Sequence, residues 1–541
     1  MARLFQNGRF FLTPDDEHST TCTFATAMLV ENGVIAHIGG ENDLPILQAK
    51  EKNVSVMDLE KRIVLPGFVD GHMHILMHGQ TMAKLDVKDC RSLEQIQDTV
   101  RAYAEANPTL PRILAHGWQQ CYTDGLALAT MLDEVDPRPI FIDALDLHST
   151  WCNTAALKEL DVEEADDPVG GHIHRDANGK PSGLLSEGAA VQSWHHIATL
   201  TTLQEKVELM RKGLQSYSAQ GYTSVVEMAM DEDSWEALEA LCSQEDIHMN
   251  IAVHWLITPT KDEAIIHKQV DRAIALKKQC EVRGITRYRI AGVKLVADGV
   301  VDACTAHVSQ PYSDGTPSGE LQWTPELMTV ALKHADAAGL QCAIHAIGDA
   351  AITQTIDALE SLGSVGKRHR IEHLELASHE DAKRLGALGI TASVQPVHSD
   401  PAILRAWPKL VGHRCGGAFP YMEFMNHGAR LAFGSDSPTA SHVPFQNLYV
   451  ATTKCSPTEV DYVTPPAVFE SAVVPMVTAV CAATYGSAYS CFAERYSGKL
   501  AKGYRADFAV IDMEWDPKEL LKSRVYQTWY GGSMVYDSTK E

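Results

Sequence analysis

The chain has 541 residues, 45% of them hydrophobic, which is enough for a large buried core and more than one domain. Its 46 basic and 70 acidic residues give a formal net charge of -24, which argues against nucleic acid and anionic membrane surfaces as partners. No uncharged apolar run reaches the roughly 18 residues of a membrane span, and the N-terminus has no signal-peptide core. The 12 cysteines are scattered without a CxxC pair, so we expect reduced thiols and a cytoplasmic protein.

Both ends of the chain are rich in short β-type runs. Residues 1–62 alternate such runs with turn signals, for example Asn32-Gly33. Residues 485–541 contain further runs at 506–511 and 527–536. The pattern predicts a small β-sandwich domain that is built from both termini.

Between these ends, apolar β-type runs alternate with helical patterns, for example at 201–219 and 261–283. This alternation is typical of a parallel sheet. Eight repeats predict an α/β chain with a (β/α)8 TIM-type barrel over 63–484, whose active site lies at the C-terminal ends of the strands. The candidate strands end at or near 74, 227, 253, 296, 345, 373, 394 and 436.

One connection in this pattern is unusually long. About 145 residues separate the first candidate strand from the second. A structureless loop of that length is implausible in a compact domain. We therefore expect residues 76–200 to form an inserted subdomain over the mouth of the barrel.

The first candidate strand ends in two histidines one residue apart, His72 and His74. Residues i and i+2 of a strand point to the same side, so both imidazoles can face one point. Imidazole pairs of this kind bind transition metals. Because the chain has 24 histidines, this pair alone is weak evidence.

Four further polar residues lie at or near the ends of other candidate strands: Lys294, His345, His373 and Asp436. Taken singly, each is more often structural than catalytic. Lys294, for example, could be a lysine whose stem is buried while its charge reaches water, or a carboxylated lysine that bridges two metals. Together with the two histidines they offer nitrogen and oxygen donors suited to zinc or a similar divalent metal.

With these residues in this order, the chain resembles the amidohydrolase superfamily. Within the superfamily it resembles the YtcJ-like (amidohydrolase-3) branch, which includes N-substituted formamide deformylase. The resemblance covers nearly the whole chain and is specific for the family, although not for a substrate. The motifs that carry it are Leu65–His74, Asp146–Asn153, Gly183–Glu187, Gly221–Val225, Val293–Gly299, Thr305-Ala306, His345–Asp349, Ile371–His373, Phe433–Pro438 and Gly498–Phe508.

The resemblance implies a metal centre. His72 and His74 would bind the more buried metal, and a carboxylated Lys294 would bridge it to a second metal that is held by His345 and His373. The expected cofactor is Zn²⁺, one or two per chain, although manganese, iron or cobalt also suit such ligands.

The resemblance also implies a reaction. Asp436 would contact the first metal and act as the proton-transfer base. The expected enzyme is a metal-dependent hydrolase of carbon–nitrogen bonds other than peptide bonds, acting on an amide, formamide or cyclic amide through metal-activated hydroxide. The alternatives are a deaminase or an esterase on the same scaffold, or a non-catalytic binding protein. The expected partner is a small-molecule substrate, and a homodimer is expected from the relatives with this architecture.

Three residues are candidates for contact with the substrate. His148 follows an apolar strand of the insert and is either a substrate ligand or a hydrogen-bonded loop histidine. Trp118 is either a wall of the pocket or ordinary packing, and Asp298 is either a functional group or a turn former beside Gly299. Glu187 could hold the insert together rather than contact substrate. An apolar, partly aromatic pocket could be shaped by Met77, Trp118, Trp151, His307 and His398.

Overall fold

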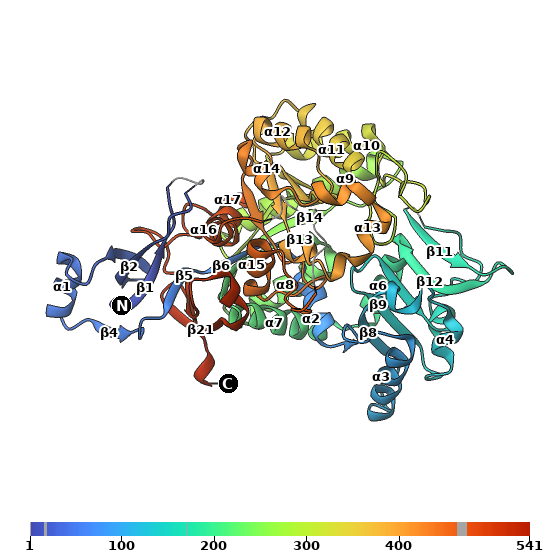
Figure 1. Cartoon of the computed structure of the whole chain (residues 1–541), viewed down its shortest axis with the longest axis horizontal. Helices are drawn as coiled ribbons and strands as arrows, with labels where there is room; N and C mark the ends of the chain where they lie inside the picture. Colours follow the sequence, from blue (N-terminus) through green and yellow to red (C-terminus); the bar gives the residue numbers. More distant parts are fainter. Residues whose placement is uncertain (1, 16–18, 169, 463–472, 541) are drawn as a thin grey trace.

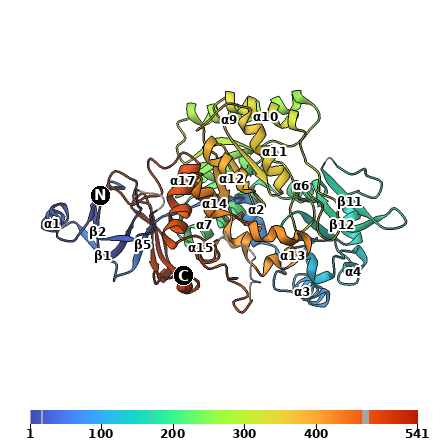
Figure 2. The same ribbon diagram turned by 45° about the horizontal axis from the view of Figure 1, so that its top comes forward.

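The computed structural model describes residues 2–15, 19–168, 170–462 and 473–540. Three parts follow one another along the long axis of the molecule (Figure 1). A β domain, drawn in blue and red, lies at one end, the barrel lies in the centre, and the insert, drawn in cyan, lies at the other end. Figure 2 shows the same order from a second direction.

The central part is a barrel of eight parallel strands in the order β19-β18-β17-β16-β15-β14-β13-β6. The barrel closes between β6 and β19, where the main-chain N–H of Asp436 donates to the carbonyl of His72 at 2.7 Å. All eight expected strands are present, and the predicted fold class is confirmed. The strands are β6 (Phe68–Met73), β13 (Tyr222–Met230), β14 (Asn250–Leu256), β15 (Tyr288–Val296), β16 (Gln341–Ala346), β17 (Arg370–His373), β18 (Thr391–Val394) and β19 (Leu431–Phe433).

Several helices around the barrel pack through one apolar stripe. In α10, for example, the buried residues Met328, Ala331, Leu332 and Ala335 recur at helical spacing. Among the described residues, no helix is long and apolar enough to cross a membrane. The helices of this part are α2 (Ile75–Met82), α7 (Leu203–Ala219), α8 (Glu232–Gln244), α9 (Glu263–Val282), α10 (Pro325–Ala337), α11 (Asp349–Glu360), α12 (His379–Leu388), α13 (Trp407–Leu410), α14 (Tyr421–Asn426), α15 (Pro444–Thr453), α16 (Met476–Cys481) and α17 (Ser487–Ser490).

The β domain joins both ends of the chain in one sheet, ordered β22-β21-β20-β5-β1-β2-β3, with β4 paired to β1. The sheet continues past residue 62, because β5 pairs with both β1 and β20. The run 527–536 is not one strand but a hairpin that turns at Gly531 and Gly532. The elements are β1 (Ala2–Leu12), β2 (Thr23–Glu31), β3 (Val34–Gly39), α1 (Leu44–Glu51), β4 (Ser55–Asp58), β5 (Ile63–Pro66), β20 (Phe508–Asp512), β21 (Arg524–Tyr530) and β22 (Ser533–Asp537).

The segment between β6 and β13 contains a six-stranded sheet of its own, ordered β11-β12-β10-β9-β8-β7. Its core includes Trp118 and Trp151, whose ring centroids lie 5.3 Å apart. The elements are β7 (Leu85–Asp86), α3 (Leu93–Ala106), β8 (Ile113–Trp118), α4 (Ala129–Asp133), β9 (Ile140–Ala144), β10 (Ser149–Cys152), α5 (Thr154–Glu159), β11 (Gly171–Arg175), β12 (Pro181–Glu187) and α6 (Gly188–Leu200).

Candidate metal centre and active site

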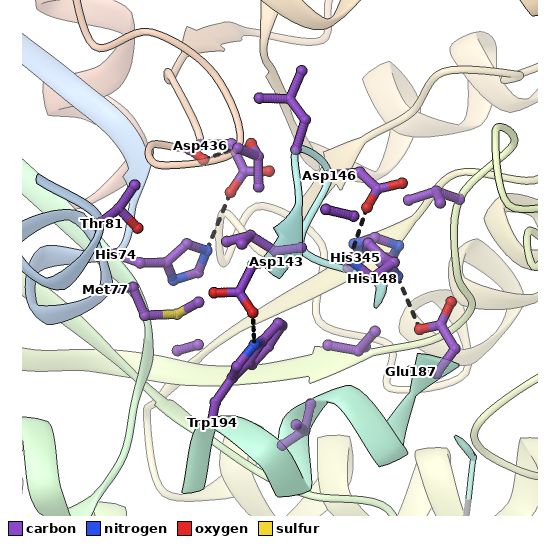
Figure 3. Close-up of a pocket in the computed structure, with 18 of the residues that line it drawn as sticks. His74, Met77, Thr81, Asp143, Asp146, His148, Glu187, Trp194, His345 and Asp436 are labelled. Atoms are coloured by element: carbon purple, nitrogen blue, oxygen red, sulfur yellow. Dashed lines mark hydrogen bonds and ion pairs between the residues drawn. The ribbon is translucent and has the colours of Figure 1, made fainter. Parts of the chain in front are cut away.

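A cavity of about 720 Å³ lies between the insert and the C-terminal ends of the barrel strands. This is the position at which barrel enzymes build their active sites. Figure 3 shows residues from both parts around it, among them His74 and Asp436 from the barrel and His148 from the insert. All six predicted metal ligands line the cavity: His72, His74, Lys294, His345, His373 and Asp436.

The first cluster joins His72, His74 and Asp436, whose ligand atoms all lie within 4.8 Å of one another. Oδ1 of Asp436 lies 3.2 Å from Nε2 of His72 and 3.1 Å from Nε2 of His74. His72 is buried, and His74 is half-buried at the cavity. The HxH pair and the last barrel strand thus converge on one carboxylate oxygen, as the strand-end pattern predicts.

A second cluster shares Asp436 and contains His373 and His398, again with ligand atoms within 4.8 Å. Nε2 of His398 lies 3.7 Å from Oδ2 of Asp436, and the rings of His373 and His398 stack at 5.8 Å. His345 packs on His373 with ring centroids 4.4 Å apart, but its Nε2 is hydrogen-bonded to the carbonyl of Gly299 at 3.2 Å. The structure therefore adds His398, which the sequence suggests only as a pocket residue, to the candidate metal ligands.

These residues fit a divalent metal. Nδ1 of His373 is buried and has no hydrogen-bond partner in the part of the chain that the structure describes. A buried polar atom without a partner is costly, and a metal ion would satisfy it. Imidazole nitrogens and a carboxylate oxygen are the donors that zinc and similar divalent ions accept.

The backbone at the ligands is strained. His373 has φ 73° and Asp436 has φ 55°, both in the left-handed region that non-glycine residues rarely adopt. Such strain persists only where the surrounding structure holds it, and it is common at functional sites. Burial raises the pKa of the Asp436 carboxyl, but the charge of His72 and the hydrogen bonds of His72 and His74 lower it by more, so the pKa lies well below its usual range.

A buried carboxylate orients His72. Oε2 of Glu372 lies 2.8 Å from Nδ1 of His72, which leaves Nε2 of that ring for the cluster. Glu372 is held in turn by Arg370, whose Nε donates to its Oε1 at 2.6 Å. Carboxylate partners of this kind fix the orientation of metal-binding histidines. Burial raises the pKa of Glu372, but the Arg370 charge and the His72 hydrogen bond bring it well below its usual range.

Lys294 lies on β15, is buried and lines the cavity. Burial lowers the pKa of its amine to about 8, although the charges of Glu372 and Asp436 act in the opposite direction. Only 3% of Lys294 is exposed, which does not fit a lysine whose charge reaches the outer surface. Its place at the cavity wall is compatible with a ligand role.

The three expected substrate contacts differ in outcome. His148 lines the cavity, with its ring centroid 6.0 Å from that of His345. Trp118 lines the cavity too, but it is buried in the insert core, where its Nε1 donates to Thr123. Asp298 is not among the lining residues: it is buried, and its carboxylate accepts main-chain N–H groups of the loops around it. The geometry gives Asp298 a structural role in place of the expected substrate contact.

Comparison with known proteins agrees with this architecture. A model of the amidohydrolase family matches residues 55–536. The chain is 28% identical over 98% of its length to LONG AFTER FAR-RED 3 of Arabidopsis thaliana, covering 91% of that protein. It is also 28% identical over 98% of its length to YtcJ of Bacillus subtilis (strain 168), which carries the name amidohydrolase, and covers 99% of it.

Two further relatives bear on the function and the fold. The N-substituted formamide deformylase of Arthrobacter pascens is 23% identical over 95% of this chain and 95% of its own length. The crystal structure of an uncharacterized metal-dependent hydrolase from Pyrococcus horikoshii OT3 matches with a TM-score of 0.74 at 23% identity, over 96% of this chain and 98% of that one. At this level of identity the structural likeness shows a shared fold.

Proposed function

This chain belongs to the amidohydrolase family, and on that premise we propose that it hydrolyses a carbon–nitrogen bond of a small amide, formamide or cyclic amide. The observation that carries the proposal is the convergence of His72, His74 and Asp436 at the wall of a substrate-sized cavity. Drug-sized ligands occupy cavities of about 300–1,000 Å³. Support for a carbon–nitrogen bond comes from the relative named as a formamide deformylase.

In this proposal His72, His74 and Asp436 hold a divalent metal, with zinc as the first expectation. A second ion would be held by His373 and His345, with a carboxylated Lys294 between the two, as the family resemblance implies. His398 is the further donor that the geometry offers at this position. When bound, such an ion supplies the Lewis acidity that makes water a nucleophile at neutral pH.

Asp436 moves the proton in the proposed reaction. Its carboxylate lies at the cavity wall and is ionised, so it can accept a proton from the attacking water. The same carboxyl then gives that proton to the leaving nitrogen, which departs as a neutral amine.

The cavity favours a substrate with a hydrophobic group. Beyond the polar cluster, apolar side chains from both the insert and the barrel form its walls, which bury the acyl or amine substituent of the substrate. The residues concerned are Met77, Leu145, Val191, Ile197, Leu256 and Ile257.

A substrate panel tests the proposal. Protein loaded with zinc is expected to release amine and acid from N-substituted formamides, N-acyl amines or cyclic amides with apolar substituents. Removal of the metal by a chelator is expected to abolish turnover, and zinc is expected to restore it. Matched esters and amino-heterocycles serve as the comparison, because a preference for either would replace the proposal with an esterase or a deaminase. If metal-replete protein turned over none of these compounds, the result would contradict the proposal that the chain is an enzyme.

A further inference from the structure

A further group of metal-binding side chains lies among the helices that surround the barrel. It consists of His379, Glu423 and His427, whose ligand atoms all lie within 4.8 Å of one another. We call these three residues the outer cluster. They come from α12 and α14 or their ends, and Figures 1 and 2 show these two helices side by side. None of the three residues lines the cavity, so the outer cluster is separate from the proposed active centre.

The two histidines of the outer cluster approach the same carboxylate oxygen. Nδ1 of His379 lies 2.6 Å from Oε2 of Glu423, and Nε2 of His427 lies 3.6 Å from that atom. The two imidazole rings stand edge to face, with centroids 5.0 Å apart. An ordinary surface ion pair needs one imidazole, whereas donors from three residues that meet at one point are what a metal ion requires.

The main chain fixes where each of the three side chains begins. Glu423 and His427 are four residues apart, a spacing that places them on one face of a helix. The N–H of His427 donates to the carbonyl of Glu423 at 3.1 Å. His379 is the first residue of α12, whose start is held by a capping box between Ser378 and Asp381. The cluster is therefore built on helix ends with defined backbone geometry.

The two helices are also packed closely at this place. A Cβ atom on Gly386 of α12 would clash with the carbonyl oxygen of His427, so glycine allows the close approach. Leu385 of α12 and Phe424 of α14 are buried in the same apolar core. The helices therefore already stand at the separation that the three donors need, and only side chains have to move when an ion binds.

The donors of the outer cluster suit zinc. Two imidazole nitrogens and one carboxylate oxygen form a known zinc ligand set, in which water takes the fourth position. Bond lengths of about 2.0–2.2 Å place tetrahedral donors about 3.3 Å apart. The two measured distances to Glu423 lie on either side of that value. The N-terminus of α12 opposes a cation, but Glu380 and Asp381 in its first turn offset this effect.

We propose that His379, Glu423 and His427 bind one Zn²⁺ outside the active centre, and that this ion fastens α14 to α12. The inference does not depend on the hydrolase function proposed above. α12 follows β17, which ends at His373, and α14 precedes β19, which leads to Asp436. The ion would thus join the outer connections of two strands that carry proposed active-site ligands. Because it binds the folded chain, it would stabilise that part of the barrel.

A zinc titration tests the proposal. Chelator-stripped protein is titrated with Zn²⁺ in competition with a chromophoric chelator of known affinity. His379→Ala, Glu423→Ala and His427→Ala should each bind one ion fewer per chain than the parent protein, or bind it more than about 100-fold more weakly. Loss of an outer partner of a metal ligand already costs about 10- to 100-fold, and these variants lose a ligand itself. The matched control is His172→Ala, which removes an exposed histidine paired with Asp167 and should bind zinc as the parent protein does.

Two further measurements separate the outer cluster from the active centre. The double variant His74→Ala with His379→Ala should bind one ion fewer than His74→Ala alone. Zn²⁺ should also raise the thermal unfolding midpoint of the parent protein by more than that of the three variants. Without metal, His379→Ala should unfold at the parental midpoint, because exposed ion pairs contribute little.

Three results would overturn the proposal. The first is that all three variants bind as many ions as the parent protein with parental affinity. The second is that His172→Ala loses an ion as they do, and the third is that Zn²⁺ raises the midpoints of parent and variants equally. The side chain of His379 is 61% exposed, so His379→Ala decides the test if another variant fails to fold.

Discussion

Replacement of Asp436 with asparagine is expected to lower kcat by about 100- to 10,000-fold, the range typical of a lost general acid–base group. Asparagine keeps the shape of the side chain but cannot take up the proton of the attacking water at neutral pH. It also removes the negative charge that lies 3.2 Å from His72 and 3.1 Å from His74. The measurement is kcat on the best panel substrate, with zinc content determined on the same sample.

The zinc content of Asp436→Asn distinguishes two causes of its lower kcat. A variant that keeps its zinc and loses turnover supports the proton-transfer role, whereas loss of both supports a ligand role. Asp357→Asn is the control, because Asp357 lies on the exposed face of α11, where it pairs with Arg384. Parental turnover by Asp436→Asn at full zinc content would show that another group moves the proton.

Replacement of Arg370 with methionine is expected to lower the free energy of unfolding by about 3–5 kcal/mol, the usual cost of removing one partner of a buried ion pair. The side chain is fully buried, and the guanidinium donates to Glu372, Ser393, Ser490 and the carbonyl of Gly71. Without it, the buried Glu372 carboxylate loses its guanidinium partner. Urea unfolding followed by tryptophan fluorescence measures the change.

Two comparisons test the origin of that loss. Arg101→Met removes an exposed pair with Asp98 on α3 and should cost less than about 1 kcal/mol. The double variant Arg370→Met with Glu372→Leu should recover part of the loss, because the uncompensated charge is gone. A single variant as stable as the parent protein would mean that the ion pair does not stabilise the barrel.

The sequence predicts the barrel well because strand, helix and strand-end chemistry repeat in a fixed order. Each expected ligand stands at or near the end of a strand, and in a barrel those ends meet at one face. The spacing from His74 to the next strand exceeds any ordinary loop, and a separate six-stranded sheet lies within that segment. The sequence pattern does not show which side chains come into contact once the barrel has closed.

His398 illustrates that limit. It lies four residues past the end of β18, in a short helical turn, so no strand-end rule selects it among 24 histidines. Glu372 precedes an expected ligand by one residue, but its contact with His72 depends on how β17 lies relative to β6 in the closed barrel. Asp298 shows the converse, since this residue of the motif Val293–Gly299 is expected to contact substrate, whereas in the structure its carboxylate holds loops together.

The central claim is that His72, His74 and Asp436 hold a divalent metal that the reaction needs. Elemental analysis of purified protein, beside His74→Ala and Lys294→Ala, tests it most directly. We expect at least one zinc per chain in the parent protein, and we expect His74→Ala to lose it. We also expect a second ion that is lost in Lys294→Ala. Protein that binds no metal after reconstitution, or a His74→Ala variant that keeps a full complement, would contradict it.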